Sequence, residues 1–386
     1  MTTSDYLRDA RVAIIGAGAV GSVLAYRLAQ AGAAVTVVER KRTGAGASGA
    51  TFGWLNGVDK APRDYHRLNM LGIRDHEALA DELDGDWIHI TGSLHWAETA
   101  DGARRTGLEQ VVRQLTAWGA RVDRCTPEEA ARDLEPDIAI DPATVGAVYL
   151  VHRSGWMDAV AMAHAALSAA RERHAARLVR GEVTAIATSN GMIDRLDLAD
   201  GTSLEADVVV NATGPDGAAF ARIAGTTLPV ERTPGLLLVS EPVPARLRRV
   251  LYGPGIHLRP DGGGRVLVQW EPLDSMAREG APLAPEDPRV REAMDQAAAV
   301  LPALAGARVE DVRLGVRAVP RDGYPLVGFD PAIGNLYHVV THSGITLAAR
   351  LAGLVTEELT GGEAGDLAPY RPDRAAGSIG GHGSAE

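Results

Sequence analysis

The segment from Arg11 to Glu39 constrains the fold of this chain more than any other segment. It reads as an apolar strand, a glycine turn, an amphipathic helix and a second strand that ends in an acid. Gly16 permits the tight turn, Gly18 lets backbone approach a ligand, and Gly21 lets the helix pack closely on the strand. The helix start offers unpaired N–H groups and a positive dipole end to phosphates. The pattern therefore predicts a strand–helix–strand unit that binds the diphosphate of a dinucleotide.

The acid at the end of the second strand narrows the nucleotide. The Glu39 carboxylate can accept hydrogen bonds from a ribose diol, and it would repel a 2′-phosphate. NADP is therefore disfavoured, whereas NAD and FAD both remain open at this point. The alternative is the same strand–helix–strand unit with no ligand, but the glycines and the acid together favour a nucleotide site.

Charge and cysteine content exclude several classes of protein. The net charge of −11 disfavours nucleic acid and anionic membranes as partners. Cys125 is the only cysteine, so no internal disulfide can form and a reducing compartment is expected. The first ten residues lack the apolar core of a secretory signal, and the uncharged run Val12–Tyr26 is shorter than the about 20 residues of a membrane span. We expect a cytoplasmic protein; its oligomeric state is left undetermined.

Residue patterns along the 386 residues predict an α/β fold, α+β overall, with two domains made of separated segments. Buried parallel strands are expected near 11–15, 206–212 and 335–340, one continuous strand over 87–98, and helices near 64–83, 158–173 and 344–359. We assign 1–86, 145–227 and 308–365 to a Rossmann-like nucleotide-binding domain. We assign 87–144 and 228–307 to a mainly antiparallel β-sheet substrate domain with flanking helices. Residues 366–386 are Gly-, Ser- and Pro-rich and are expected to be a disordered tail.

Five segments carry a resemblance to a known family. They are 16–39, 46–56, 209–217, 315–328 and 342–348. With these motifs the chain resembles the FAD-dependent amine and amino-acid oxidoreductases, the family of D-amino acid oxidase, glycine oxidase and sarcosine oxidase. The resemblance covers roughly residues 10 to 362. The two C-terminal segments, in this order and spacing, are much more specific than the glycine turn.

The resemblance implies that FAD is the cofactor. FAD should be non-covalent, because Cys125 lies outside the segment that tethers FAD in sarcosine oxidases and no histidine lies in the 44–56 loop. The helix that begins at Gly344 would aim its N–H groups at the flavin, where negative charge develops on reduction. The expected cofactor residues are Gly16, Gly18, Ala19, Val20, Gly21, Glu39, Arg40, Ser48, Ala50, Thr51, Val183, Ala212, Thr213, Gly214, Gly315, Arg317, Gly344, Ile345, Thr346 and Leu347.

The same resemblance implies a substrate site beside the flavin. Arg317 would hold a substrate carboxylate with its guanidinium fork, unless it forms a structural ion pair with an acid such as Asp322. His257 and His342 are candidates to bind substrate or move a proton; the alternatives are a solvent-facing side chain and a helix cap. The expected cavity-lining residues are Trp54, Asn56, Tyr252 and Gln269. No metal site is expected.

The implied reaction removes a hydride from the carbon next to an amine, which gives an imine and reduced flavin. The substrate would be a small amine or amino acid, or a cyclic imino acid, with a carboxylate, and the electrons would pass to O2 or another acceptor. The region that carries the oxygen-activating lysine in sarcosine oxidases has no lysine here, so oxidase and dehydrogenase both stay open. The alternatives are a nicotinamide dehydrogenase, a flavoprotein domain of RNA modification, which the net charge disfavours, and a non-catalytic flavoprotein.

Overall fold

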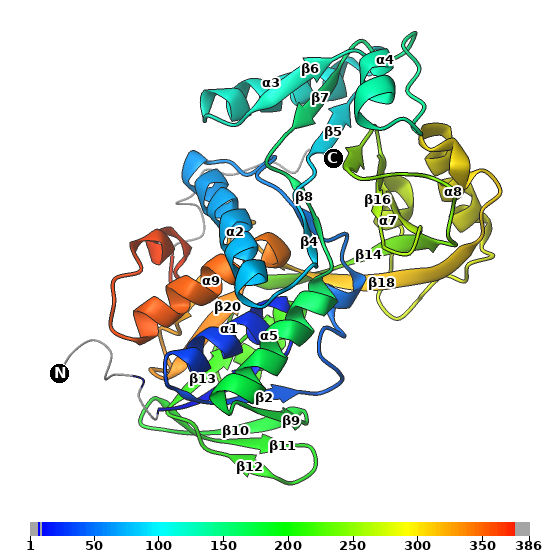
Figure 1. Ribbon diagram of the computed structural model, residues 1–386. Helices are drawn as coiled ribbons and strands as arrows, with labels where there is room; N and C mark the ends of the chain where they lie inside the picture. The colour runs from blue at the N-terminus through cyan, green and yellow to red at the C-terminus, as the bar shows by residue number, and fades with distance from the viewer. Residues whose placement is uncertain (1–6, 8–9, 375–386) are drawn as a thin grey trace.

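Two large sheets organise the molecule. The computed structural model describes residue 7 and residues 10–374. A six-stranded sheet with its helices forms one part, and an eight-stranded sheet forms the other (Figure 1). The predicted mixed α/β fold, with a Rossmann-like part assembled from distant segments, is confirmed.

The six-stranded sheet has the strand order β19-β20-β13-β1-β2-β9. Every neighbouring pair is parallel except β19 with β20, which is antiparallel. Its bounds are β1 Arg11–Ile15, β2 Ala34–Glu39, β9 Arg177–Arg180, β13 Val208–Asn211, β19 Leu326–Phe329 and β20 Leu336–Val340. The three predicted parallel strands are therefore neighbours, although more than a hundred residues separate β13 from β20 and β1 from β13.

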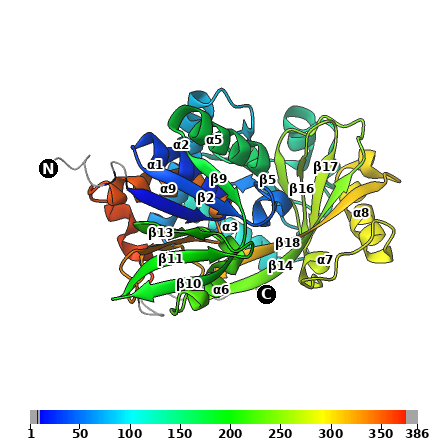
Figure 2. The same ribbon diagram turned by 90° about the horizontal axis from the view of Figure 1, so that it is seen from below.

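Strand β1 shows why both faces of this sheet are covered. Val12 and Ile14 point into the core formed with the helices, whereas Ala13 and Ile15 point into a second core on the opposite face. The first face carries α1 Ala19–Gln30, α5 Ala159–His174 and α9 Gly344–Leu359, with α2 Arg63–Glu82 packed on α9. The other face carries the small sheet β10 Val183–Ser189, β11 Met192–Leu198 and β12 Ser203–Leu204, and α6 Gly217–Ile223. Figure 2 shows these layers in side view.

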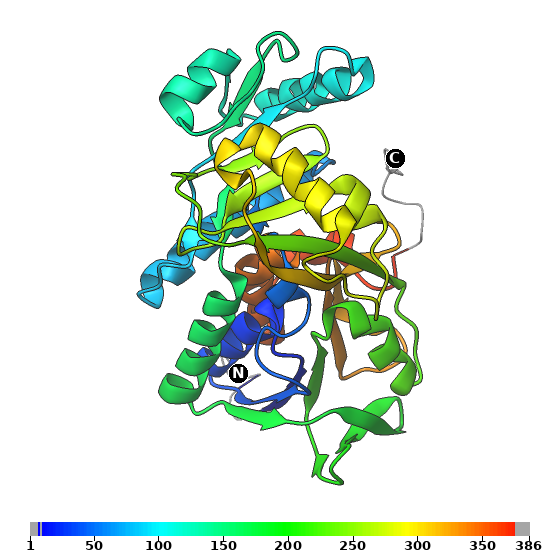
Figure 3. The same cartoon turned by 90° about the vertical axis from the view of Figure 1, so that its right-hand side faces the viewer.

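The eight-stranded sheet has the order β18-β14-β17-β16-β15-β5-β7-β6. Its bounds are β5 Ser93–Trp96, β6 Val122–Cys125, β7 Val148–Val151, β14 Val230–Ser240, β15 Val250–Tyr252, β16 Ile256–Pro260, β17 Val266–Trp270 and β18 Val309–Pro320. Helix α8, Pro288–Val300, covers the outer face and packs on Leu236 and Leu238 (Figure 3). Leu237 and Val239 point the other way and pack with Phe52. The long antiparallel pair β14–β18 runs from this sheet to the six-stranded part, where Val230 and Ala318 pack with Val340 of β20.

The remaining elements are short or peripheral. A three-stranded sheet is formed by β3 Trp54–Leu55, β8 Gly155–Met157 and β4 Ile88–His89. The other helices are α3 Gly102–Ala117, α4 Pro127–Glu129 and α7 Glu271–Ser275, with short helical turns η2 Ala47–Ala50, η3 Ala130–Leu134, η4 Gly214–Asp216, η5 Pro302–Leu304 and η6 Gly365–Tyr370. No helix in the described part of the chain is long and apolar enough to cross a membrane.

Two sequence-based expectations about local structure need correction. The single strand predicted over 87–98 is broken: Gly92 has a φ of +88°, and β4 and β5 on either side of it join different sheets. Residues 366–374 are ordered rather than disordered, because Leu367 is buried, Asp366 pairs with Arg350 at 2.6 Å and Arg374 pairs with Asp322 at 2.8 Å. Residues 375–386 lie outside the described residues.

The division into two domains stays a prediction, but sheet membership favours other boundaries. We placed 145–151 and 308–320 in the nucleotide-binding domain. Strands β7 and β18, which occupy these ranges, pair within the eight-stranded sheet instead. Single-strand patterns give no information on the sheet that a strand joins, because that choice depends on its distant neighbours.

Candidate functional site

A cavity of about 800 Å³ lies between the two sheets. This volume is within the usual range of cofactor and ligand sites. All residues that the sequence assigned to the cofactor or the substrate line it, except Gly21 and Leu347. All five segments that carry the family resemblance therefore contribute to this cavity, the first with Gly16 after β1 and the last with Thr346 at the start of α9.

Glycines shape one end of the cavity by allowing close backbone packing. Gly16 has a φ of +107°, and a Cβ placed on it would lie 2.5 Å from the Ala212 carbonyl oxygen. A Cβ on Gly21 would lie 2.0 Å from the Gly16 oxygen, so any side chain there would push α1 off the turn. Gly21 thus acts by packing and does not line the cavity. Similarly, a Cβ on Gly315 would lie 2.5 Å from the Ala50 oxygen.

The start of α1 provides the polar groups of this end. The Ser48 hydroxyl accepts a hydrogen bond from Ala19 N at 2.9 Å, which fixes η2 against the helix start. The Glu39 carboxylate accepts from Ala17 N at 2.9 Å and from Lys41 N at 2.8 Å, so its position beside the cavity is set by backbone. A helix N-terminus whose cap residue, Gly18, has no side chain and a fixed carboxylate match a diphosphate and a ribose diol. These residues therefore fit the adenosine diphosphate end of FAD.

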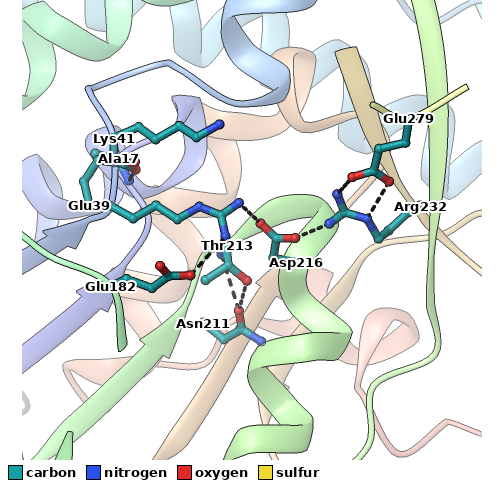
Figure 4. A network of polar contacts seen from close by, with 10 residues as sticks. Ala17, Glu39, Lys41, Glu182, Asn211, Thr213, Asp216, Arg232 and Glu279 are labelled. Carbon is teal, nitrogen blue, oxygen red and sulfur yellow. Dashed lines mark hydrogen bonds and ion pairs between the residues drawn. The ribbon is translucent and has the colours of Figure 1, made fainter. Parts of the chain in front are cut away.

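A chain of ion pairs runs along the rim of this end (Figure 4). Arg40 pairs with Asp216 at 2.5 Å and with Glu182 at 3.6 Å, and Asp216 also pairs with Arg232, which in turn pairs with Glu279. The chain links β2 and η4 of the six-stranded part to β14 of the other sheet and to Glu279, beyond α7. Only Arg40 of this group was expected from the sequence, because ion pairs between distant segments leave no local pattern.

Thr213 is positioned by a buried polar network. Its hydroxyl donates to Asn211 Oδ1 at 2.7 Å, and Asn211 Nδ2 lies 3.1 Å from His338 Nδ1. His338 Nε2 lies 3.0 Å from Asp330 Oδ2. Burial lowers the pKa of His338 despite the nearby carboxylate of Asp330. The network joins β13 to β20 and fixes the turn of Thr213 and Gly214, which lines the cavity.

The start of α9 forms the middle of the cavity. Gly344, Ile345 and Thr346 line it, and the Thr346 hydroxyl donates to the Trp54 carbonyl oxygen at 3.2 Å. The expectation for Leu347 is wrong: its side chain is fully buried in the core, and its N–H donates to Ser343 O at 3.0 Å. The first free N–H groups of the helix lie before it, as the geometry of a helix N-terminus requires.

Aromatic and imidazole rings form the wall at the other end. The Tyr252 ring stacks on His257 with a centroid distance of 3.9 Å and on Trp54 with 4.9 Å. His257 is buried rather than solvent-facing, and burial lowers its pKa to about 4. Its Nε2 has no hydrogen-bond partner among the described residues, and the nearest carboxylate, Glu271, lies 3.8 Å away. Asn56 and Gln269 lie on the same wall. The imidazole is therefore neutral near pH 7, with a free nitrogen.

Arg317 projects from β18 and is held from behind. Its Nη1 donates to Asp274 Oδ2 at 3.0 Å and its Nη2 to the Pro234 carbonyl at 3.0 Å. Its ion-pair partner is therefore Asp274 and not Asp322, which pairs with Arg374. The Nε group has no partner among the described residues. These two contacts fix the guanidinium, and each Nη group keeps a second N–H for a ligand. A structural ion pair and a carboxylate-binding role, which the sequence offered as alternatives for Arg317, are therefore compatible.

His342 lies between these groups. Its side chain is exposed to the cavity, while the surrounding protein lowers its pKa to about 4, with the positive charges of Lys60 and Arg317 acting in the same direction. The position that caps α9 is Ser343, so His342 is not the cap. Like His257, it is a neutral imidazole near pH 7.

Sequence reasoning missed three residues of this end: Phe52, Lys60 and Asp274 all line the cavity. The segment that carries a lysine in sarcosine oxidases has none here, yet Lys60 reaches the cavity from a different segment, the loop before α2. A usable signal was present, since the chain has only two lysines. Within residue 7 and residues 10–374, no cluster of three His, Cys, Asp or Glu side chains is arranged to hold a metal ion.

Comparisons with known proteins agree with this geometry. Residues 11–358 match the family model described as DAO, FAD dependent oxidoreductase. The chain is 30% identical to glycine oxidase of Geobacillus kaustophilus, over 96% of this chain and 98% of that protein. It is 26% identical to one of the subunits of the opine oxidase of Agrobacterium tumefaciens, over 92% of this chain and 94% of that protein.

Solved structures give the same picture. The crystal structure of glycine oxidase from Geobacillus kaustophilus has a TM-score of 0.84 at 26% identity and covers 95% of this chain and 100% of its own. The L-proline dehydrogenase of P. horikoshii, at 21% identity, shares the fold with a TM-score of 0.81 over 95% and 97%. The family's cofactor is FAD, and this chain binds it non-covalently, like its glycine oxidase relatives; its cysteine, Cys125, lies on β6 outside the cavity lining. The chain is thus an enzyme that belongs to the family of FAD-dependent oxidoreductases.

Proposed function

We propose that the enzyme oxidises a small amine or amino acid that carries a carboxylate. The observation that supports this most is Arg317, which lines the cavity and whose guanidinium is fixed by one hydrogen bond from each Nη group, to Asp274 and to the Pro234 carbonyl. A guanidinium binds a carboxylate through two parallel hydrogen bonds, which would fix the adjacent α-carbon in one orientation. FAD supplies a ring that accepts a hydride from that carbon.

The residues around the reacting carbon suit an amine. Removal of the hydride leaves a C=N bond only if the nitrogen lone pair is free, so the amine must be bound neutral. The neutral imidazoles of His257 and His342 can accept a hydrogen bond from its N–H group. The aromatic wall of Trp54 and Tyr252 excludes water from the same region. The product is an imine.

The names of relatives support an amine as substrate. Two of the similar proteins are named for the oxidation of glycine and of opines. Reoxidation by O2 or by another acceptor fits this chain equally well, and the cytoplasmic location expected from the sequence stays a prediction.

Anaerobic mixing of the purified holoenzyme with a panel of D-, L- and N-alkyl amino acids tests the proposal. Loss of the flavin's visible absorbance with at least one of them is the expected result. Matched amines without the carboxylate should bleach the flavin far more slowly, because Arg317 then has no anion to bind. If amines and 2-hydroxy acids are equally good, or no amino compound bleaches the flavin, the proposed reaction is wrong.

A further inference from the structure

Asp274 joins two cavity-lining side chains that come from different strands. Its Oδ2 accepts a hydrogen bond from Arg317 Nη1 at 3.0 Å and another from Gln269 Nε2 at 3.3 Å. Arg317 lies on β18, Gln269 on β17 and Asp274 itself on α7, and all three line the cavity. The Asp274 carboxylate therefore ties the expected carboxylate-binding group to the neighbouring cavity wall.

The Asp274 carboxylate is itself fixed by backbone. Its Oδ1 accepts a hydrogen bond from Leu236 N on β14 at 2.9 Å. Strand β14 pairs with β17 at Leu238 and Val239, and Leu236 N lies before that ladder begins, so it is open to a side chain. The Asp274 side chain is only 15% exposed, and a carboxylate taken out of water is stable only where donors surround it. Donors from β14, β17 and β18 thus leave it one favoured position.

The backbone beside this carboxylate is shaped to receive it. A Cβ on Gly235 would lie 2.5 Å from Asp274 Oδ1 and 3.2 Å from Arg317 Cζ. The carbonyl of the preceding residue, Pro234, accepts a hydrogen bond from Arg317 Nη2 at 3.0 Å. The guanidinium and the carboxylate therefore both lie directly against β14, at a position where any side chain would push them into the cavity.

Through Gln269, Asp274 also reaches the imidazole wall. Gln269 and His257 are register partners in the antiparallel pair β16–β17, so their side chains lie next to each other on one face of the sheet. His257 Nε2 has no hydrogen-bond partner among the described residues. The contacts of Asp274 thus fix the group that would bind the substrate carboxylate and the neighbour of an imidazole that would meet the amine.

We propose that Asp274 is a positioning residue: by holding Arg317 and Gln269 in one arrangement, it sets where the carbon next to the substrate nitrogen lies. This inference rests on the proposed function and assigns a further residue to it. The bond changes of that reaction stay the same, because Asp274 acts only through Arg317 and Gln269. In an α-amino acid the reacting carbon carries the carboxylate. In its β-homologue the reacting carbon is one C–C bond, about 1.5 Å, farther from the carboxylate, and a fixed anchor would misplace it.

Asp274→Asn separates positioning from binding. The variant keeps an oxygen for Leu236 N but loses the charge that holds Arg317. Two effects on ligand binding then oppose each other: the released guanidinium must be ordered by the ligand, but its charge is no longer partly neutralised. The Kd of methoxyacetate, which has no nitrogen to oxidise, should therefore change by less than about threefold, measured through the flavin absorbance of the holoenzyme.

The rate of flavin reduction should carry the loss instead. With a saturating α-amino acid in anaerobic stopped flow, Asp274→Asn should reduce its flavin about 10- to 100-fold more slowly than the wild type, because the reacting carbon is no longer held in place. The wild type should prefer N-methylglycine to N-methyl-β-alanine by at least about 100-fold in kcat/KM, and the variant by at least about tenfold less.

Two further variants complete the test. Gly235→Ala displaces the same two groups from the strand side and should lower the preference for the α-amino acid in the same way, which decides the matter if Asp274→Asn does not fold. The control is Asp311→Asn, which removes an exposed Asp–Arg pair of the same strand β18, outside the cavity lining. It should change neither the reduction rate nor the preference.

Three results would overturn the proposal. An unchanged reduction rate in Asp274→Asn would leave the residue without a role in positioning. Equal slowing of both substrates, with loss of FAD or of thermal stability, would assign it to general structure. Loss of methoxyacetate affinity as large as in Arg317→Ala would assign it to binding. In all three cases bleaching of the wild-type flavin by an amino acid leaves the proposed function standing, whereas no bleaching by any amine would overturn that function itself.

Discussion

The two ends of the cavity are built in different ways. The end around Gly16 and Glu39 is made mainly of backbone groups and glycines, and several of its contacts stay within residues 11–39, such as Ala17 N with the Glu39 carboxylate and Gly21 against the Gly16 oxygen. The end around Arg317 is made of side chains that are held by partners from other segments. The Asp274 carboxylate accepts a hydrogen bond from Arg317, and the Trp54 carbonyl accepts one from the Thr346 hydroxyl. The difference teaches that cofactor binding here depends on local backbone geometry, whereas substrate selection depends on long-range packing.

The most damaging change is expected at the backbone end, with Gly21→Ala. The new Cβ would lie 2.0 Å from the Gly16 oxygen, and since that atom belongs to backbone, α1 must move away from the turn. We expect a loss of FAD affinity of at least about 100-fold, or roughly 3 kcal/mol, measured by titration of the apoprotein. The helical Gly353→Ala has open space around it and serves as control. Full retention of FAD by Gly21→Ala would show that the FAD site tolerates a shift of α1 away from the Gly16 turn.

At the side-chain end, Arg317→Ala should lower kcat/KM for carboxylated amines by about 100-fold, because the charged hydrogen bonds to the substrate are lost. FAD content should stay unchanged, in contrast to Gly21→Ala. Its control is Arg321→Ala, an exposed arginine four residues later that pairs only weakly with Glu231, at 3.8 Å. If Arg317→Ala loses FAD as well as activity, Arg317 also contributes to FAD binding, and the two ends of the cavity cannot be altered independently.

Lowering the pH should destabilise the protein through His76, a buried histidine of α2 that is hydrogen-bonded to α9. His76 Nε2 donates to Ile345 O at 2.7 Å, and complete burial lowers its pKa from 6.5 to about 4. Between these two values the unfolded chain binds a proton that the native protein does not, so stability falls as pH drops from about 6.5 toward 4 and is constant above. The loss from His76 is roughly 2.5 kcal/mol at pH 4.5.

Urea unfolding at pH 7 and pH 4.5 measures this loss. The His76→Gln variant should show a smaller pH dependence than the wild type, with the remainder contributed by groups such as His95 and His257, whose pKa values are also lowered by burial. An identical slope in the variant would mean that His76 does not stay neutral in the native protein.

The smallest effect is expected at the rim of the backbone end. Glu279→Gln breaks the ion pair with Arg232, but both side chains are more than a third exposed, so solvent screens the attraction between them. Stability and FAD affinity should change less than in any of the variants above, and less still at high salt. A large, salt-sensitive loss of FAD affinity would instead show that the ion pairs of the rim contribute to FAD binding.

The sequence alone determined the backbone end and the order of the elements. Gly16, Gly18 and Glu39 could be assigned because a turn, a helix start and a strand end depend on neighbours in the chain. Strands β13 and β20 could be predicted as well, since a strand buried on both faces is largely apolar, here with Asn211 and His338 as the polar exceptions.

Only the tertiary structure decided what surrounds the substrate. It paired Arg317 with Asp274, broke the strand at Gly92, ordered residues 366–374 and brought Lys60 to the cavity wall. It also removed Leu347 from the site, because the N–H of that residue is already bonded within α9. Leu347 is the local exception, because its N–H bonds to Ser343 four residues earlier. The other four share one physical reason: burial, ion pairing and sheet membership depend on residues far away in sequence, and no local pattern records which of them meet.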